Sequence, residues 1–316
     1  MPALDVVGLG EVVIDLIASI PRFPEPDEKI FATKYEKHPG GVTANFCVAL
    51  SRLGIKAGFI GGLGEDADGT YLRDAFRREG VDATRLVTRK GALTPLNFVT
   101  ITPDGQKTIF QSPYMLSVFP RPEELDLDYI AEARVLHTTA LQVDTAERAL
   151  KHAKKEGLTT SFDLEKHVAV YGFEKLAPLI KLTDILLPNK MGALTLTGTQ
   201  SVKEAAEKLL ALGPRTVIIT LGEKGCLIKT EKETLEVPAF KVKAVDATGA
   251  GDAFNAGLIT GILTQWDFHE AATFANAVAA IKITHVGAQT GLPTRKEVDG
   301  FLEKRGHPSR SRESIT

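Results

Sequence analysis

Short apolar runs alternate with helical patterns through the middle and C-terminal parts of the chain, and this alternation constrains the fold more than any other feature. The runs predicted to be strands cover residues 135–137, 159–163, 185–187 and 216–220. The helices predicted between them lie near residues 145–156 and 202–212. Short strands joined by helices of this length form a parallel sheet with helices on both faces. Ligands of such sheets bind beyond the carboxyl ends of the strands, so reactive side chains are expected there.

Two segments do not follow this alternation. Residues 30–38 and 96–110 have the pattern of short strands, and the second segment turns at Pro103-Asp104-Gly105. No helix follows either segment directly, so both fit poorly in a doubly wound sheet. A pair of edge hairpins packed on the main sheet is the interpretation that the pattern alone offers.

Composition excludes several classes of protein. The chain has 316 residues, enough for one large α/β domain or two smaller ones, and a formal net charge of −2. This charge gives no basic surface for nucleic acid or for membranes. Cys47 and Cys226 are the only cysteines, which excludes a disulfide framework. Asp5, Glu11 and Asp15 interrupt the first apolar stretch, so no signal peptide is predicted and a cytoplasmic protein is expected.

A glycine-rich run leads directly into a predicted helix near the C-terminal end. Asp246-Ala-Thr-Gly-Ala-Gly-Asp252 precedes residues 253–263, where apolar side chains recur at helical spacing. Glycines at a helix N-terminus expose main-chain N–H groups and the positive end of the helix dipole, which together bind anions. A carboxylate in the first turn, Asp252, can then take a proton from an attacking hydroxyl. An ordinary loop with Asp252 as the helix N-cap is the alternative.

This block resembles the C-terminal signature of the ribokinase-like (PfkB) carbohydrate kinases. Three more blocks of that family occur in order, at residues 39–45, 220–225 and 287–294, so the resemblance extends over residues 5–300. It implies a ribokinase-like three-layer α/β/α fold, with a mostly parallel central sheet and a small β-strand lid. The expected organisation is a single domain over residues 1–303 with lid strands from about 12–38 and 95–112, followed by a flexible tail over residues 304–316.

The resemblance also implies an activity: an ATP-dependent kinase that uses Mg²⁺ and phosphorylates a primary hydroxyl of a small sugar or polyol. Asp252 would be the general base, and the amides of Gly249, Ala250, Gly251 and Asp252 would bind the transferring phosphate. Asp246 resembles a position that helps to hold a monovalent cation such as K⁺, although a turn-initiating aspartate is an equal alternative. Lid strands that pair between subunits would form a homodimer interface.

Further positions are assigned by the same resemblance. Those expected to contact sugar hydroxyls are Asp15, Gly40, Gly41 and Asn45. Those expected to contact the nucleotide are Asn189, Thr220, Gly222, Gly225 and Asn276. For Thr220, Gly222 and Gly225 the alternative is a hairpin turn that needs glycines for its own sake.

Two departures from the family pattern bear on metal and substrate. The family pattern Asn-x-x-Glu, whose glutamate supports magnesium through water, becomes Asn189-Lys-Met-Gly192. If the position is vacant and the backbone tolerates a side chain, Gly192→Glu should lower the magnesium requirement; Asp163 or Glu165 could otherwise replace the missing acid. The segment Asp163-Leu-Glu-Lys-His167 stands where fructokinase-like and ketodeoxygluconate-kinase-like members have Asp-x-Asn-x-Arg.

Other functions are compatible with parts of the sequence. A nucleoside or inositol kinase on the same fold is the first alternative. A sugar-binding protein without catalysis would explain Gly192 but not Asp252 and its glycines. A dinucleotide oxidoreductase would use Gly8-Leu-Gly10, but Val13 occupies its third glycine position. The sequence contains no Walker motif, and its histidines show no metal-ligand spacing.

Overall fold

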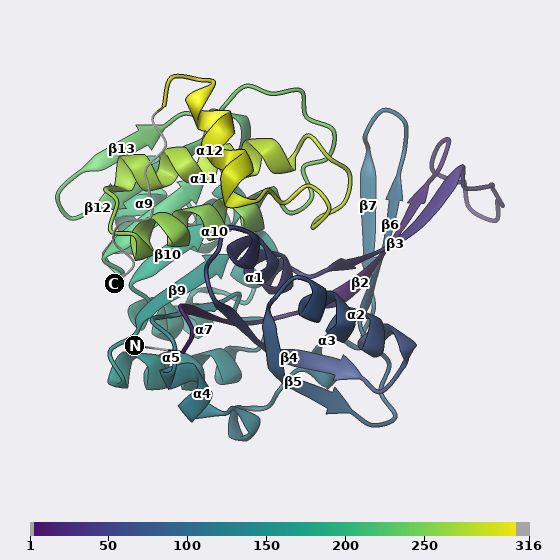
Figure 1. The fold of residues 1–316 in the computed structure, drawn as a ribbon, viewed down its shortest axis with the longest axis horizontal. Coiled ribbons are helices and arrows are strands. Elements are labelled where there is room, and N and C mark those ends of the chain that lie inside the picture. The colour runs from purple at the N-terminus through teal and green to yellow at the C-terminus, as the bar shows by residue number, and fades with distance from the viewer. Residues whose placement is uncertain (1–2, 308–316) are drawn as a thin grey trace.

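The computed structural model describes residues 3–307, and its largest element is a nine-stranded sheet (Figure 1). The strand order is β13-β12-β11-β10-β9-β8-β1-β4-β5. These strands are β1 (Val6–Leu9), β4 (Ala57–Gly64), β5 (Asp82–Arg89), β8 (Val135–Thr138), β9 (Thr159–Leu164), β10 (Ile185–Pro188), β11 (Thr216–Thr220), β12 (Cys226–Thr230) and β13 (Thr234–Val237). Seven neighbouring strands of this sheet run parallel, namely β11, β10, β9, β8, β1, β4 and β5. The remaining two, β12 and β13, pair antiparallel. A short turn joins β11 to β12, so the chain reverses there without a crossover helix.

Helices cover both faces of this sheet (Figure 1). One face packs against α1 (Val42–Arg52), α2 (Ala67–Arg78), α10 (Ala250–Leu263), α11 (Phe268–Lys282) and α12 (Arg295–Glu303). The other packs against α4 (Leu127–Ala131), α5 (Val143–Lys155), α6 (Lys166–Ala169), α7 (Phe173–Lys181), α8 (Lys190–Thr197) and α9 (Val202–Leu210). Successive strand residues serve the two cores in turn: Val217 and Ile219 face one, and Ile218 faces the other. The three-layer α/β/α fold is therefore confirmed.

A separate four-stranded sheet projects from one end of the molecule (Figure 1). Its order is β3 (Lys34–Gly40), β2 (Val13–Ser19), β6 (Leu96–Ile101) and β7 (Lys107–Gln111), and we call it the lid sheet. β2 and β6 pair in parallel, and the outer strands pair antiparallel to them. The segments that did not fit the doubly wound pattern thus form a sheet of their own. The short helix α3 (Met115–Val118) follows β7 and leads back to the main sheet.

Gly8 and Gly10, which invited comparison with a dinucleotide fingerprint, have a packing role. A Cβ atom at Gly8 would lie 2.5 Å from the Cys47 Sγ atom, and one at Gly10 would overlap Thr43. Both partners belong to α1, so these glycines let α1 lie close against β1. This contact accounts for both glycines without a bound dinucleotide.

Two further points concern the C-terminal tail and the possibility of a membrane-spanning helix. The tail predicted to be flexible spans residues 304–316, of which 308–316 lie outside the described residues. Within residues 3–307, none of the helices has the length and apolar character that crossing a membrane requires.

Candidate active site

A cavity of about 770 Å³ is lined both by the lid sheet and by loops at the carboxyl ends of the main-sheet strands. Glu11 follows β1 and Glu165 follows β9, and both side chains line it. The predicted residues brought together here are Asp15, Gly41, Asn45, Gly249, Ala250, Gly251 and Asp252. Residues separated by more than 200 positions therefore meet in one cavity, where a parallel sheet is expected to bind its ligands.

The glycine-rich run forms the N-terminus of α10, as the sequence predicts. Gly249 is the N-cap, with a φ of 79° that favours glycine, and the helix begins at Ala250. The N–H group of Ala250 donates to the Ala247 carbonyl oxygen at 3.1 Å. The N–H groups of Gly249, Gly251 and Asp252 have no such acceptor within residues 3–307. Those of Gly251 and Asp252 lie in the first turn of α10 and are the helix amides available to an anion.

Asp252 is buried at this helix terminus and is held by a short chain of amides. The Asn45 Nδ2 atom donates to the Asp252 carboxylate at 2.7 Å, and the Gln289 Nε2 atom donates to the Asn45 Oδ1 atom at 3.0 Å. This chain fixes the orientation of the carboxylate. The sequence assigned Asn45 to sugar contacts alone and did not single out Gln289.

The surroundings of Asp252 are rich in carboxyl groups. Burial raises the pKa of Asp252 well above its ordinary value, and the charge of Glu165 raises it further, while the hydrogen bond from Asn45 and the charge of Lys282 act against this. Burial, then the charges of Glu165 and Asp252, also raise the pKa of Asp163 well above its ordinary value. The carboxyl groups at this end of the cavity therefore hold protons more readily than they would in water.

Glu165 and His167 form a pair on the cavity wall. The His167 Nδ1 atom lies 3.2 Å from a Glu165 carboxylate oxygen. This hydrogen bond raises the pKa of His167 against the opposing effect of burial, and the charges of Glu165 and Glu11 add to the increase. Where the resembling kinases have asparagine and arginine, this chain thus presents a carboxylate with an imidazole paired to it. Such a wall suits hydroxyl groups better than carboxylates.

Asp15 reaches the cavity from the lid strand β2. Its carboxylate accepts a hydrogen bond from the Asn97 Nδ2 atom on β6 at 2.9 Å. Burial raises the pKa of Asp15, against this hydrogen bond and the charges of Lys107 and His38. Gly40 does not itself line the cavity, but a Cβ atom there would overlap the Asp15 carboxylate. Glycine at residue 40 therefore leaves room for Asp15.

Gly41 brings α1 close to the first loop of the main sheet. Its φ is 103°, and a Cβ atom there would lie 2.6 Å from the Glu11 main-chain oxygen. The Val42 N–H group at the start of α1 donates to the Glu11 carboxylate, whose other oxygen accepts from Thr139 at 2.9 Å. Glycine is needed here for both its backbone conformation and its small size.

The lid sheet also contacts the loop that leads into α10, residues 246–249, directly. The Lys107 Nζ atom on β7 donates to the Thr248 Oγ1 atom at 2.9 Å, and both residues line the cavity. A positive charge beside this loop favours an anion in this part of the cavity. The sequence did not single out Lys107.

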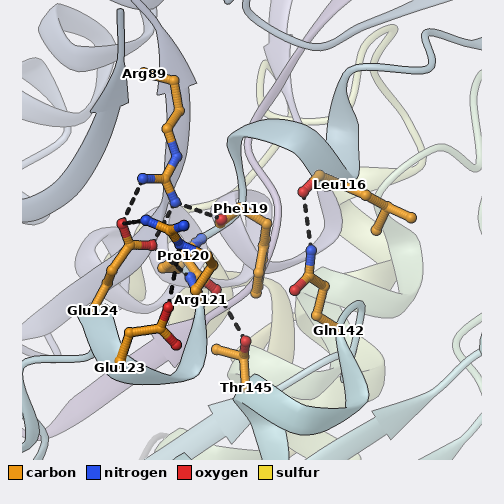
Figure 2. A network of polar contacts seen from close by, with 9 residues as sticks. All are labelled: Arg89, Leu116, Phe119, Pro120, Arg121, Glu123, Glu124, Gln142 and Thr145. Atoms are coloured by element: carbon orange, nitrogen blue, oxygen red, sulfur yellow. Dashed lines mark hydrogen bonds and ion pairs between the residues drawn. The ribbon is translucent and has the colours of Figure 1, made fainter.

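The segment after the lid sheet is tied to the main body by polar contacts (Figure 2). Arg89 pairs with Glu124 and also donates to the Phe119 carbonyl oxygen at 3.0 Å. From α5, Thr145 donates to the Pro120 carbonyl oxygen, and nearby Gln142 donates to that of Leu116. Leu116 lines the cavity, so these contacts fix one of its walls.

The residues predicted to bind nucleotide lie outside the cavity, in two neighbouring places. Asn189 and Thr220 form a bridge between the ends of β10 and β11. The Asn276 side chain is buried and donates to the carbonyl oxygens of Val237 and Pro238. A Cβ atom at Gly225 would press on the same 237–239 segment. Gly222 opens a short 3₁₀ turn, η2 (Gly222–Lys224), in the predicted connection between β11 and β12.

Gly192 faces the end of the neighbouring strand. The Gly192 N–H group donates a hydrogen bond to the Asn189 Oδ1 atom at 2.7 Å, so Asn189 caps the N-terminus of α8. A Cβ atom at residue 192 would overlap the Leu164 carbonyl oxygen and lie 3.2 Å from the Glu165 carbonyl carbon. The backbone therefore does not tolerate a side chain there, and the condition for restoring a glutamate at residue 192 is not met.

We expect Gly192→Glu to destabilise the protein rather than to lower its magnesium requirement. The new side chain must displace main-chain atoms, and overpacking of this kind costs about 1–3 kcal/mol. Thermal melting measures the loss, with Lys190→Glu, in the same helix but exposed, as the control. A Gly192→Glu protein that melts at the wild-type temperature would contradict this account of the 164–165 contact.

The arrangement defines a phosphotransferase: an aspartate, free helix amides and a covering sheet around a polar cavity. The pfkB family carbohydrate kinase pattern matches residues 3–295, and the chain belongs to this family. It is an ATP-dependent carbohydrate kinase, as the sequence predicts.

Known proteins that are similar in sequence or structure are also named as carbohydrate kinases. A ribokinase from Haemophilus influenzae is 33% identical over 308 residues, covering 93% of this chain and 97% of that protein. A fructokinase from Solanum tuberosum is 33% identical over 314 residues, covering 94% and 95%. The structure of Arabidopsis thaliana ribokinase complexed with ribose and ATP has a TM-score of 0.83 at 25% identity and covers 95% of this chain and 99% of that one.

Proposed function

We propose that this chain transfers the γ-phosphate of ATP to a primary hydroxyl group of a small, uncharged sugar. The observation that carries the proposal is the position of Asp252, which lines the cavity beside two free amides and is held there by Asn45. The similar proteins named ribokinase and fructokinase make ribose and fructose the first acceptors to consider. The ribokinase structure with ribose and ATP supports ATP as the donor.

The proposed reaction uses few groups. The Asp252 carboxylate takes the proton of the acceptor hydroxyl as its oxygen attacks the γ-phosphorus. The bond from that phosphorus to the bridging oxygen of ADP breaks, and the products are the sugar phosphate and ADP. The Gly251 and Asp252 amides stabilise the negative charge on the transferring group, in the manner of an oxyanion hole. Ala250 and Gly249 shape the turn that presents these amides.

The acceptor would lie against the lid sheet. Asp15 and Asn45 offer an acceptor and an amide to hydroxyl groups, and Gly40 and Gly41 let the start of α1 approach the sugar. Four carboxyl side chains line this cavity, namely Glu11, Asp15, Glu165 and Asp252, against Lys107 and the His167 imidazole paired to Glu165. The acceptor is therefore a neutral polyol or sugar rather than a sugar acid.

A coupled assay of ADP release over ribose, fructose, ketodeoxygluconate, inositol and nucleosides tests this proposal. We expect the highest kcat/KM with a neutral sugar, and a value about tenfold or more lower with a sugar acid, because an unpaired charge beside carboxylates is costly. Asp15→Asn should raise the KM for the sugar more than that for ATP. A sugar acid as the best acceptor would refute the charge argument, and no turnover with any acceptor would refute the kinase assignment of this site.

We place the nucleotide beyond the cavity, at the ends of β10 and β11. Asn189 and Thr220 lie side by side there, and Gly222 and Gly225 stand at the two ends of the following turn. Asn276 holds the 237–238 segment that borders this turn. A nucleotide there would direct its phosphates toward the α10 N-terminus, where the free amides lie.

Magnesium would enter with the nucleotide phosphates, whose charge it neutralises when bound. Hard oxygen ligands suit it, and it usually keeps several waters. Glu165 fits the role of the missing glutamate, since it lines the cavity and its backbone abuts Gly192. Asp163 already accepts a hydrogen bond from Asn255 and does not line the cavity.

We expect Glu165→Gln to raise the magnesium concentration needed for half-maximal activity. The substitution keeps the size of the side chain but removes a charge that attracts the cation and its waters. A magnesium titration at saturating sugar and ATP measures the shift, with Asp163→Asn as the control. An unchanged half-saturation point in Glu165→Gln would mean that another group holds the metal.

A homodimer through the lid sheets is proposed as the assembly. Tyr35, Phe98 and Phe110 are exposed, and the strand register puts them on the face of the lid sheet opposite Asn97 and Val99, which line the cavity. An exposed aromatic face of this kind marks an interaction site. Sedimentation should show a dimer, and Phe110→Glu should shift it to a monomer. A wild-type monomer at micromolar concentration would remove the proposal.

The cytosol is the proposed compartment. Cys47 and Cys226 are both buried and free, and burial raises the pKa of each thiol, that of Cys226 to about 12. Inert reduced thiols suit a reducing compartment. Fractionation of expressing cells checks this assignment, and recovery in a membrane fraction would contradict it.

A further inference from the structure

Lys282 is a fully buried lysine beneath residues 246–249. We assign the transferring phosphate to the end of this loop and call it the phosphate-binding loop. Lys282 is the last residue of α11, and its exposure is 0%. Its Nζ atom donates to the main-chain oxygen of Asp246 at 2.8 Å. Within residues 3–307 it forms no direct ion pair with a carboxylate. A buried ammonium group is costly unless its surroundings compensate it, so its presence at this place calls for a role.

Asp246, next to this ammonium group, is the residue that the resemblance assigns to a monovalent cation. One of its carboxylate oxygens accepts two hydrogen bonds from Thr248, one from the N–H group at 2.9 Å and one from the hydroxyl group at 2.6 Å. The other accepts from the Gly287 N–H group at 2.8 Å. The main-chain oxygen of Asp246 accepts a hydrogen bond from the Lys282 ammonium group. The oxygens that K⁺ would need from Asp246 are therefore engaged by donors of the chain itself, so the residues present do not fit the ion.

The charges around the site point the same way. Burial alone would raise the pKa of Asp246, but the hydrogen bonds from Thr248 and Gly287 and the charge of Lys282 hold it below its ordinary value. Burial lowers the pKa of Lys282, as does the charge of Lys107, whereas the charges of Asp246 and Asp252 raise it. A second positive charge would meet repulsion from Lys282 at short range.

We infer that the Lys282 ammonium group is a built-in monovalent cation, which takes the place of K⁺ beneath the phosphate-binding loop. It carries the same single charge as K⁺ and, as a group of the chain, is always present. Ile283, the next residue, accepts hydrogen bonds from the N–H groups of Val245 and Asp246, so the end of α11 holds both the backbone and the charge of this loop. Catalysis should then need no added monovalent cation. The catalytic part of this inference rests on the proposed kinase function.

The wild-type protein gives the first test. Activity and melting temperature are measured with K⁺, Na⁺ or tetramethylammonium as the only monovalent cation, at equal ionic strength. We expect kcat to agree within about twofold and melting temperatures to coincide, because an ion that binds only the native state would raise the melting temperature. Thallium(I) NMR should detect no specific site. Activation of about fivefold or more by K⁺, or a K⁺-specific rise in melting temperature, would overturn the inference.

Lys282→Met gives the second test, since it keeps much of the side chain's bulk and removes the charge. Without K⁺ we expect kcat to fall about 100-fold, the lower end of the loss found when one group that stabilises developing charge is removed. K⁺ should restore part of this loss and raise the melting temperature of the variant. The exposed Lys296→Met is the control and should behave as wild type. Wild-type turnover of Lys282→Met in tetramethylammonium would refute the role of the charge.

The two tests separate possible failures. If Lys282→Met does not fold, the wild-type activity, melting and thallium measurements still decide whether a monovalent cation binds. If no sugar is phosphorylated, the proposed function fails, while the melting and thallium measurements still test whether Lys282 excludes a cation from the site.

Discussion

Asp252→Asn is expected to lower kcat by about 10³-fold while the protein folds normally, because general-base catalysis contributes factors of about 10²–10⁴. Asparagine has the same shape, and its Oδ1 atom can accept the hydrogen bond that Asn45 donates. The amides of Gly251 and residue 252 stay in place, so ATP binding should be nearly unchanged. The substitution therefore removes the base and leaves the rest of the site.

The control for this experiment is Asp163→Asn. Asp163 is another buried carboxyl group near Asp252, but its side chain accepts from Asn255 and does not line the cavity. We expect Asp163→Asn to keep turnover within about tenfold of wild type. Steady-state assays on both variants, at saturating ATP and sugar, make the comparison. Turnover of Asp252→Asn within the same range would show that another group takes the proton.

The same substitution has a predicted effect on pH dependence and stability. The base must be ionised, and the pKa of Asp252 is raised by burial and by Glu165, so the acid limb of kcat/KM should lie above the ordinary aspartate value of about 4. Because the folded-state pKa exceeds the unfolded one, the native state binds the proton more tightly. Its stability then falls as pH rises through this interval, and the loss persists at neutral pH. Asp252→Asn should consequently melt at a higher temperature than wild type at pH 7.

The main sheet was predictable from sequence because its strands are buried on both faces. Residues 216–220 were predicted as a strand, and β11 covers the same residues, since a continuous apolar run leaves little ambiguity. The lid was harder. The strand predicted to begin at Ile30 begins instead at Lys34, where its pairing with β2 starts opposite Ser19. Edge strands of a small sheet carry a weaker pattern than central strands.

The site was predictable where glycine or a reactive carboxylate marks it, and not where its residues act through distant partners. Gly249 and Gly251 stand out in the sequence, since close approach to an anion restricts the residue types. Gln289 reaches Asn45 across 244 residues of chain, and no local pattern encodes such a contact. Lys282 left one signal: it is the first charged residue after eleven uncharged positions of its helix, residues 271–281. A lone charge in a buried helix indicates a role inside the fold.

Gly251→Val is the second variant with a large expected effect, and it isolates the phosphate site from the base. Gly251 lies in the first turn of α10, and a Cβ atom there would have no other atom within 4 Å. Its backbone is helical, and valine has a helix propensity no worse than that of glycine, so the substitution carries no propensity cost. The variant should therefore fold and melt close to wild type. Its side chain would instead project from the cavity wall beside the free amides.

The consequence for catalysis follows from that position. A transferring phosphate must approach the Gly251 and Asp252 N–H groups to within hydrogen-bond distance, and the valine methyl groups would hold it away. Losing such donors costs a factor of about 10²–10³ in kcat, and we expect Gly251→Val to lose at least this much, with Gly251→Ala losing less. Gly249→Ala is the contrasting variant. Its φ of 79° and the Ala288 carbonyl oxygen, 2.8 Å from the new Cβ atom, predict a loss of melting temperature as well as of activity. Wild-type turnover in a folded Gly251→Val protein would place the phosphate away from the α10 N-terminus, and the role assigned to Asp252 would then fail with it.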